Sequence, residues 1–404
     1  MRPESGLSRT LHSIRMEIQA AIRLRAGRRL LEDAYGLLPV FIATSIGTDV
    51  PPRRLRAHVR SFLQTHAVLR LEHERLPSGA RCHEVHNAEP LLELVRRGAG
   101  VMVCSLHYGP YFCVGSELLA LGVDVNLLSA SAMIQRQDGM WQRVAQVHGR
   151  RLELLRVERL SGTRSIMRIL REGGLVLLYA DGQGGLDGSR SSKGHRTTGS
   201  FLSMPIRMWT GPAYLAQRAD AHVVFAAVRR EAWGKRVLEF SDPMKVPPDG
   251  GEQAPATFTR YMYRWFEPRV RQQPEQWAGW GLPHLFLEET GTAPRATVDA
   301  LEQEQRRMAE LLNAPGGRTR LRAEPTRVAY VGEGDRYVLI DGPTRRVLEV
   351  DGLTVAVLGA AYRGVRLGRL PRELNADIPR LSDVVARLTL AGLARLDGAG
   401  APTS

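Results

Sequence analysis

The sequence predicts an α/β fold in which helices cover a mixed β-sheet, followed by a smaller C-terminal α+β unit. Strand-like and helix-like patterns alternate from residue 92 to about 245, a segment rich in Gly and Pro follows at 291–317, and short alternating strands begin near residue 327. Such alternation is typical of sheets covered by helices. We therefore expect four regions, which are a helical region at 1–90, an α/β core at 91–290, a linker with one short helix at 291–324 and the C-terminal unit at 325–398.

Length and charge limit the classes of protein to consider. A chain of 404 residues has room for two or three domains. Its formal charge of +14 comes almost entirely from arginine, because only Lys193, Lys235 and Lys245 are lysine. Such a charge favours contact with anionic membranes, nucleotides or acidic carriers.

Cysteine content and hydropathy bear on the compartment. Three cysteines argue for a reducing environment and against a disulfide scaffold. No apolar run reaches the roughly 18 residues of a membrane span, and no secretory signal is recognisable at the amino terminus. We expect a cytoplasmic protein, with peripheral contact to the inner membrane face as an alternative.

The first region is helical in pattern. Residues 14–29 form a basic amphipathic pattern that would lie on a membrane surface or pack on the core. After Pro51-Pro52 the helical pattern resumes at 54–74. Cys82, His83 and His86 then resemble metal ligands, but no second cluster with zinc spacing follows, so we expect a surface strand or loop and no bound metal.

The α/β core is expected to contain six strands and four main helices. The strands are predicted at 101–106, 123–128, 152–156, 175–180, 222–228 and 237–240. The helices are predicted at 111–121, 140–148, 163–171 and 206–218.

The first of these strands ends at a histidine. His107 follows the apolar run 101–106 and precedes Tyr-Gly109-Pro-Tyr111 and a helix. Ligands of open α/β sheets bind at the carboxyl ends of strands, and a histidine there can act as a base at neutral pH. The alternative is a core or turn histidine without chemistry.

A second candidate lies after the strand at 175–180. Asp181 and Gln183 open a glycine-rich loop that carries Arg190, Lys193 and Arg196. Glycine lets a backbone approach a ligand closely, and the three basic side chains are suited to phosphates. The loop lacks the order of a Walker loop or a dinucleotide fingerprint, and the alternative is a flexible surface loop.

These segments resemble the bacterial lipid A late acyltransferases of the lauroyl/myristoyl type over about residues 10–285. His107-Tyr-Gly109-Pro-Tyr resembles the histidine motif of that family, and Leu178-Tyr-Ala-Asp181-Gly-Gln183 its Asp-Gln strand end. The segment 201–230 resembles the following helix–strand unit, and Pro274-Glu-Gln-Trp277 the terminal signature. The resemblance implies a glycerolipid acyltransferase-like fold.

The resemblance also implies acyl transfer from acyl-CoA or an acyl-carrier protein to a hydroxyl or amine, with no further cofactor. His107 would deprotonate the acceptor, and Gly109, Tyr111, Gln183, Arg190, Lys193 and Arg196 would contact substrates. Backbone amides near Gly109 would stabilise the oxyanion.

The chain departs from the family at the carboxylate that orients the histidine. Five residues after His107 stands Phe112, which neither accepts a hydrogen bond nor carries charge. Asp181 would replace that carboxylate if the two strand ends are neighbours, whereas Glu117 is expected to point away. Ser129-Ala-Ser131 also stands where the family has an arginine-containing acceptor motif, and the transmembrane anchor is missing, so lipid A itself is not the expected acceptor.

In the C-terminal unit the segments 327–331, 337–340 and 346–350 read as strands, and 354–362 and 381–391 as helices. With Val-Leu-Ile-Asp341, Val347-Leu-Glu-Val350-Asp351 and the closing segment 384–393, this unit resembles PqqD-like peptide chaperones. The resemblance implies a winged-helix domain that binds a precursor peptide by strand addition. The helix at 381–391 carries Arg387 as its one basic residue, which disfavours nucleic acid as a partner. A winged helix that only packs on the enzyme is the alternative.

Two functions follow from the sequence. The first is an acyltransferase that acts on a lipid, peptide or natural-product intermediate, with His107 as the general base and Asp181 as its orienting residue or as an acceptor ligand. The second is a catalytically inactive acyltransferase fold that binds an acyl chain or precursor peptide. Phe112 favours the second function, and the presence of His107, Asp181 and Gln183 favours the first.

Overall fold

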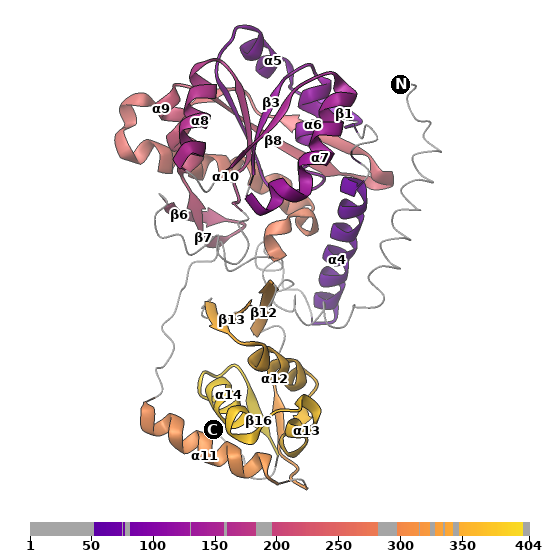
Figure 1. The fold of residues 1–404 in the computed structure, drawn as a ribbon, viewed down its shortest axis with the longest axis vertical. Helices are drawn as coiled ribbons and strands as arrows, with labels where there is room; N and C mark the ends of the chain where they lie inside the picture. The colour runs from indigo at the N-terminus through magenta and orange to yellow at the C-terminus, as the bar shows by residue number, and fades with distance from the viewer. Residues whose placement is uncertain are drawn as a thin grey trace. The chain divides into compact units, whose positions relative to one another are not determined.

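The computed structural model describes two compact units, one within Arg60–Phe286 and one within Leu287–Ser404 (Figure 1). The described residues are 52–74, 76, 81–129, 131–156, 160–182, 196–281, 297–314, 316–323, 328–333, 336–341 and 347–398. The amphipathic pattern predicted at 14–29 lies outside them. No helix among these residues is long and apolar enough to cross a membrane.

The first unit is built on a mixed sheet, as the sequence predicted. Its strand order is β1-β9-β8-β2-β5-β3-β4, with β10 paired to β8. Neighbouring strands are parallel except that β8 pairs antiparallel with β9 and β10. The strands are β1 Glu84–His86, β2 Val101–Ser105, β3 Val125–Ser129, β4 Leu152–Arg156, β5 Leu175–Tyr179, β8 His222–Arg230, β9 Arg236–Phe240 and β10 Met244–Lys245.

The strand β2 is buried along its whole length, as expected of a central strand in a sheet that helices cover on both faces. Trp141 and Leu118, from α7 and α6, share a core with Val101 and Val103. Helices α8 and α9 lie on the other side of the sheet from α6 and α7 (Figure 1). The helices with residues in this unit are α4 Pro52–Glu74, of which the part from Arg60 belongs to it, α5 Glu89–Arg96, α6 Cys113–Ala120, α7 Ser131–His148, α8 Leu160–Arg171, α9 Gly211–Ala219 and α10 Ala254–Gln272, with 3-10 turns at Ala232–Gly234, Pro248–Gln253, Pro274–Gln276 and Ala278–Gly281.

The helix predicted at 206–218 is wrong in its first part. Met204–Trp209 is the strand β7, which pairs antiparallel with β6 Arg196–Phe201, and the helix α9 begins only at Gly211. Met204, Ile206 and Met208 are buried and alternate with less buried residues. Burial of every second residue is typical of a strand. The same apolar residues also fit the spacing of a helix, which is why the sequence predicted one here.

The second unit contains the predicted hairpin, in which β12 Val328–Glu333 pairs with β13 Arg336–Asp341 and β13 pairs with β14 Val347–Val350. A second sheet has the order β15-β11-β16. The remaining elements are α11 Val298–Leu312, β11 Arg320–Arg322, α12 Gly352–Tyr362, β15 Val365–Arg366, a 3-10 turn at Leu367–Arg369, α13 Leu370–Leu374, α14 Ile378–Leu390 and β16 Arg395–Asp397.

Helix α11 lies in the segment 291–324, where one short linker helix is expected, but it packs into the second unit. Its Met308 and Leu312 are buried in the core of the second unit, together with Leu381 and Val385 of α14. The Gly and Pro residues on both sides of this helix are typical of a linker, but its apolar residues recur at helical spacing and pack on the core. Helix α11 therefore belongs to the second unit.

Candidate active site

His107 and Asp181 lie side by side because their strands are neighbours. Strands β2 and β5 are parallel and pair Ser105 with Tyr179, so each candidate residue lies two positions beyond a paired residue. The Ala180 amide donates to the Ser105 carbonyl over 2.7 Å, which extends the ladder to the loop. Parallel strands end at the same edge of a sheet, and this edge is where such folds place ligands.

Two hydrogen bonds join the two residues. The backbone N–H of His107 donates to Asp181 Oδ2 over 2.9 Å, and His107 Nδ1 lies 2.6 Å from Asp181 Oδ1. A carboxylate only accepts, so Nδ1 carries the proton and Nε2 presents its lone pair. The Asp181 side chain is fully buried, whereas 17% of the His107 side chain is exposed. The imidazole is thus oriented from inside the protein and reachable from outside.

Trp277 gives Asp181 a further donor. Its indole Nε1 donates to Asp181 Oδ2 over 3.1 Å. The backbone after it also braces the histidine loop, because the Ala278 amide donates to the His107 carbonyl over 2.8 Å and Tyr108 forms a β-bridge with Trp277. Carboxylates that accept several hydrogen bonds in a buried site are held in one orientation. The segment that the sequence analysis matched to a terminal signature therefore belongs to the site.

Gln276 and Gly109 fix the turn after the histidine. The Gly109 amide donates to the Gln276 carbonyl over 2.9 Å. The Gln276 side chain binds both backbone groups of Arg230 at the end of β8. Gly109 has φ +58°, and a Cβ atom there would lie 2.1 Å from the Val228 carbonyl oxygen. Only glycine allows this turn to approach β8 so closely.

Four backbone amides around Gly109, where an oxyanion site is expected, donate to carbonyls of the protein. The amides of Tyr108, Gly109, Tyr111 and Cys113 donate to the carbonyls of Leu106, Gln276, Gly109 and Pro110. These amides already have acceptors within the protein, so they are not free to bind a developing oxyanion. The positive φ of Gly109 and its close approach to Val228 shape this turn.

Two tyrosines form walls beside the imidazole. The rings of Tyr111 and Tyr179 each lie 4.7 Å from the His107 ring, measured between centroids. The Tyr179 hydroxyl donates to the Tyr111 carbonyl over 3.2 Å. Burial raises the pKa of Tyr111 to about 12 and raises the pKa of Tyr179 well above its usual range, so both phenols stay protonated at neutral pH. The sequence analysis missed Tyr179, although it is the last residue of β5.

Phe112 and Glu117 lie away from the imidazole. Phe112 is buried in the core, and its ring stacks on His73 with centroids 4.8 Å apart. Glu117 is fully buried in α6, where it accepts hydrogen bonds from the Arg81 guanidinium and the Cys82 amide. Asp181 is therefore the carboxylate that contacts His107.

Three residues of the predicted glycine-rich loop, Gln183, Arg190 and Lys193, lie outside the described residues. Arg196 is described at the start of β6, and its guanidinium lies 4.1 Å from the centroid of the Trp209 ring.

Trp209 connects Arg196 to the histidine site. Its indole lies against Gly182, the residue that follows Asp181. Burial and the nearby Arg207 lower the pKa of Arg196, which stays charged at neutral pH. The Trp209 ring therefore lies between the Arg196 guanidinium and the backbone at Gly182, next to Asp181.

The histidines once considered as metal ligands have other contacts. His83 Nδ1 accepts the Arg236 amide over 2.9 Å, and His86 Nε2 faces Glu84 at 3.5 Å on the short strand β1. Within the described part of the chain, His, Cys, Asp and Glu side chains form no group of three or more that would hold a metal ion.

A family model described as bacterial lipid A biosynthesis acyltransferase matches residues 62–280, which is more than half of the chain. The match includes His107, Asp181 and Trp277 and ends before the second unit. A search of curated proteins gave no match.

Proposed function

Because the chain belongs to the bacterial lipid A biosynthesis acyltransferase family, we propose that it moves a fatty acyl group from acyl-CoA or an acyl-carrier protein to a hydroxyl or amine. Membership makes it an acyltransferase linked to lipid biosynthesis. The observation that supports the proposed chemistry is the 2.6 Å contact between His107 Nδ1 and Asp181 Oδ1. A buried carboxylate on Nδ1 is the arrangement that prepares Nε2 as a general base.

The proposed reaction uses His107 as base and then as acid. Nε2 takes the proton of the acceptor hydroxyl or amine while the acceptor atom bonds to the thioester carbonyl carbon. The C–S bond then breaks, and the imidazolium returns its proton to the leaving sulfur. Proton transfer of this kind contributes about 10²–10⁴-fold to a rate. Donor and acceptor are both substrates, and the proposal requires no cofactor.

Asp181 is the proposed orienting residue in place of the carboxylate expected at position 112. Its carboxylate accepts hydrogen bonds from the His107 amide, the His107 imidazole and the Trp277 indole. This contact supports the enzyme over the inactive binding protein, because the argument for the latter was the loss of an orienting carboxylate at Phe112.

Arg196, together with Arg190 and Lys193 of the preceding loop, is the proposed contact for the phosphates of the donor. The position of the Arg196 guanidinium over Trp209, beside the loop of Asp181, supports this assignment. Gln183 and Tyr111 are proposed to contact the substrates, and Tyr111 is supported by its packing on the His107 ring.

We propose a peptide as one possible acceptor of the acyl group, beside a lipid or a small natural-product intermediate. The sheet β12-β13-β14 offers two outer strands, each of which pairs with β13 alone among the described residues. An extended peptide binds such an edge by backbone hydrogen bonds. This supports a peptide-binding role of the PqqD-like kind for the second unit.

The test measures cleavage of acyl-CoA and acyl-carrier donors in the presence of alcohol, amine and peptide acceptors. His107→Ala and Asp181→Asn should each lower turnover by about 10²-fold or more. His86→Ala serves as the control, because His86 is an exposed histidine of β1. Absence of turnover by the unaltered protein, together with tight binding of acyl chains or peptide, would support the inactive binding fold instead.

A further inference from the structure

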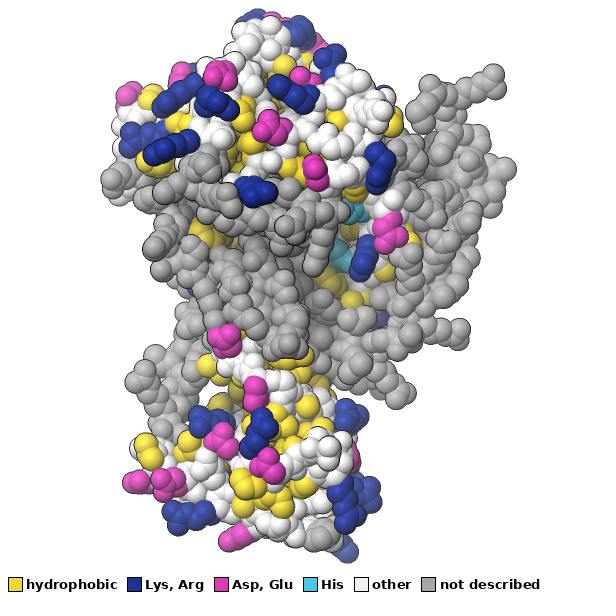
Figure 2. Space-filling model, viewed as in Figure 1, with side chains coloured by type: hydrophobic (Ala, Val, Ile, Leu, Met, Phe, Trp, Pro, Cys, Tyr) yellow, Lys and Arg dark blue, Asp and Glu magenta, His cyan; other side chains and the backbone are white. Residues whose placement is uncertain are grey.

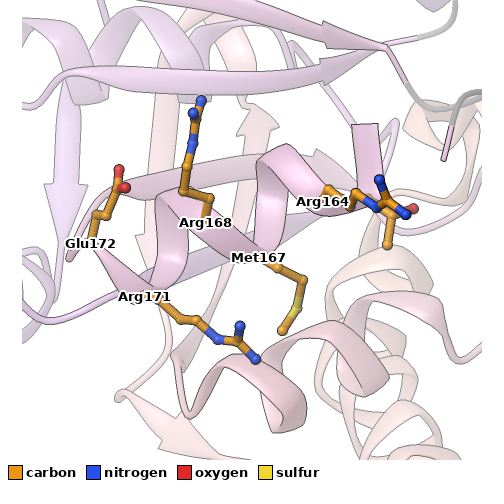
Figure 3. Close-up of a pocket in the computed structure, with 6 residues that line it drawn as sticks. Arg164, Met167, Arg168, Arg171 and Glu172 are labelled. Atoms are coloured by element: carbon orange, nitrogen blue, oxygen red, sulfur yellow. The ribbon is translucent and has the colours of Figure 1, made fainter. Parts of the chain in front are cut away.

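Helix α8 presents a basic outer face on the first unit. Its exposed or partly exposed side chains line a shallow hollow (Figure 3), and we call this set the α8 arginine face. The set consists of Thr163, Arg164, Met167, Arg168, Arg171 and Glu172. The opposite side of the helix buries Ile166 and Leu170. Basic side chains gather over α8 and α9 in the space-filling view (Figure 2).

Among the described residues of the unit, the arginines of this face form no ion pairs. Arg164 and Arg168 have no ion-pair partner within the part of the chain that the structure describes. The Arg171 guanidinium donates to the Arg218 carbonyl at the end of α9, which fixes its position without neutralising its charge. Favourable interaction with the helix dipole accounts for Arg168 and Arg171 in the last turn, but not for Arg164 near the middle of the helix.

The face suits a broad anionic surface rather than a single phosphate. Arg168 and Arg171 extend to opposite sides of α8 (Figure 3), so their guanidinium groups do not converge on one small anion. A bilayer is disfavoured because interfacial helices insert large apolar side chains. The large hydrophobic side chains exposed among the described residues are Val147, Tyr261 and Val298, and none belongs to α8.

The topology places the first turn of α8, at one end of this face, at the same edge of the sheet as the histidine site. Strand β4 ends at Arg156 and runs parallel to the neighbouring β3, which is parallel to β5. Helix α8 connects β4 to β5, so its first turn lies at the edge of the sheet where His107 and Asp181 follow their strands. Arg164 is the arginine of the face closest along the helix to that edge.

We propose that the α8 arginine face docks the acidic surface of an acyl-carrier protein, and so selects carrier-bound donors over acyl-CoA. The inference rests on the proposed function for the identity of the donor. Charge complementarity raises the association rate and fixes the orientation of a partner. A carrier held at this face would present its thioester at the edge that carries His107.

The test compares two double charge reversals in the full-length protein. Arg164→Glu/Arg168→Glu alters the face, and Arg143→Glu/Arg150→Glu makes the same change of charge at exposed positions of α7 and the turn after it. KM and kcat are measured with an acyl-carrier protein and with acyl-CoA carrying the same acyl chain. The α8 variant should raise KM for the carrier about tenfold with little change in kcat, and the effect should shrink at high salt.

The outcomes distinguish a failure of the proposed docking surface from a failure of the proposed acyl transfer. An unchanged KM for the carrier, or an equal rise in the α7 control, overturns the docking surface while acyl transfer stands. A loss of binding to phosphatidylglycerol vesicles with unchanged carrier KM would assign the face to a membrane and also overturn it. If the unaltered protein turns over no donor, fluorescence anisotropy of labelled carrier protein still tests docking, and equal binding by both variants overturns it.

Discussion

Trp277 Nε1 donates a hydrogen bond to Asp181 Oδ2 over 3.1 Å, although 96 residues separate the two in the chain. The same oxygen accepts the His107 amide, so Trp277 acts on the imidazole through Asp181. Trp277 is therefore a positioning residue in the proposed reaction, without contact to the reacting atoms.

Trp277→Phe should lower kcat about tenfold, because Asp181 loses one of its donors and holds His107 less firmly. Loss of a hydrogen bond to a buried carboxylate should also lower the free energy of unfolding by about 1–3 kcal/mol. The matched control is Trp280→Phe, which removes an indole bond to the Pro274 carbonyl of 2.8 Å. Similar kcat losses in both variants, with an unchanged pH profile of kcat/KM, would argue for a purely structural role of Trp277.

Gly109→Ala should lower stability more than Gly98→Ala. Both glycines have positive φ, +58° and +68°, so both alanine variants carry backbone strain of about 1–2 kcal/mol. A Cβ at Gly109 would also lie 2.1 Å from the Val228 carbonyl oxygen, whereas one at Gly98 meets no atom within 4 Å. Urea unfolding of the two variants measures the difference, and donor cleavage should fall only in Gly109→Ala. Equal free energies of unfolding would contradict the close contact with β8.

Much of the α/β core could be predicted from the sequence because each buried strand is a short apolar run. The partner of His107 could not be assigned, since one sequence does not give the order of parallel strands. Asp181 was proposed on the condition that its strand is a neighbour, and the pairing of Ser105 with Tyr179 meets that condition.

Contacts between distant segments were beyond the reach of local patterns. Trp277 was noted as part of a motif without a role, and the bond to Asp181 depends on the course of the chain after α10. The hydrogen bond from the Gly109 amide to the Gln276 carbonyl could not be predicted for the same reason. Periodicity also failed at Ile206, where a strand runs directly into a helix and the two patterns overlap.

Phe112→Glu should not restore a carboxylate to the site. Phe112 is buried in the core and stacks on His73, so a glutamate there would be charged in an apolar environment. We expect the free energy of unfolding to fall by about 3 kcal/mol or more, against about 1 kcal/mol for Phe112→Leu. Donor cleavage by Asp181→Asn should not recover when Phe112→Glu is added. Recovery in the double variant would mean that position 112 reaches His107, contrary to its packing.

The stability of the first unit should fall in mild acid because of His66 on α4. Its Nε2 atom is buried without a hydrogen-bond partner, and burial lowers the pKa of the imidazole from 6.5 to about 4. The folded protein keeps His66 neutral between these values, while the unfolded chain binds a proton there. The free energy of unfolding is therefore unaffected by His66 above about pH 6.5, and protonation of His66 in the unfolded chain lowers it as the pH falls toward 4.

The lowered pKa of His66 should reduce the free energy of unfolding by about 2–3 kcal/mol near pH 4.5. Free energies of unfolding in urea, measured between about pH 4.5 and 7.5, should fall less steeply for His66→Phe than for the unaltered protein. His86→Phe provides the control, because it makes the same replacement at an exposed histidine of β1. Other histidines with lowered pKa, such as His73 and His148, are the same in all three proteins and cancel in the comparison. Parallel pH curves for His66→Phe and the unaltered protein would show that the imidazole accepts a proton without unfolding, and so that Nε2 finds a partner when charged.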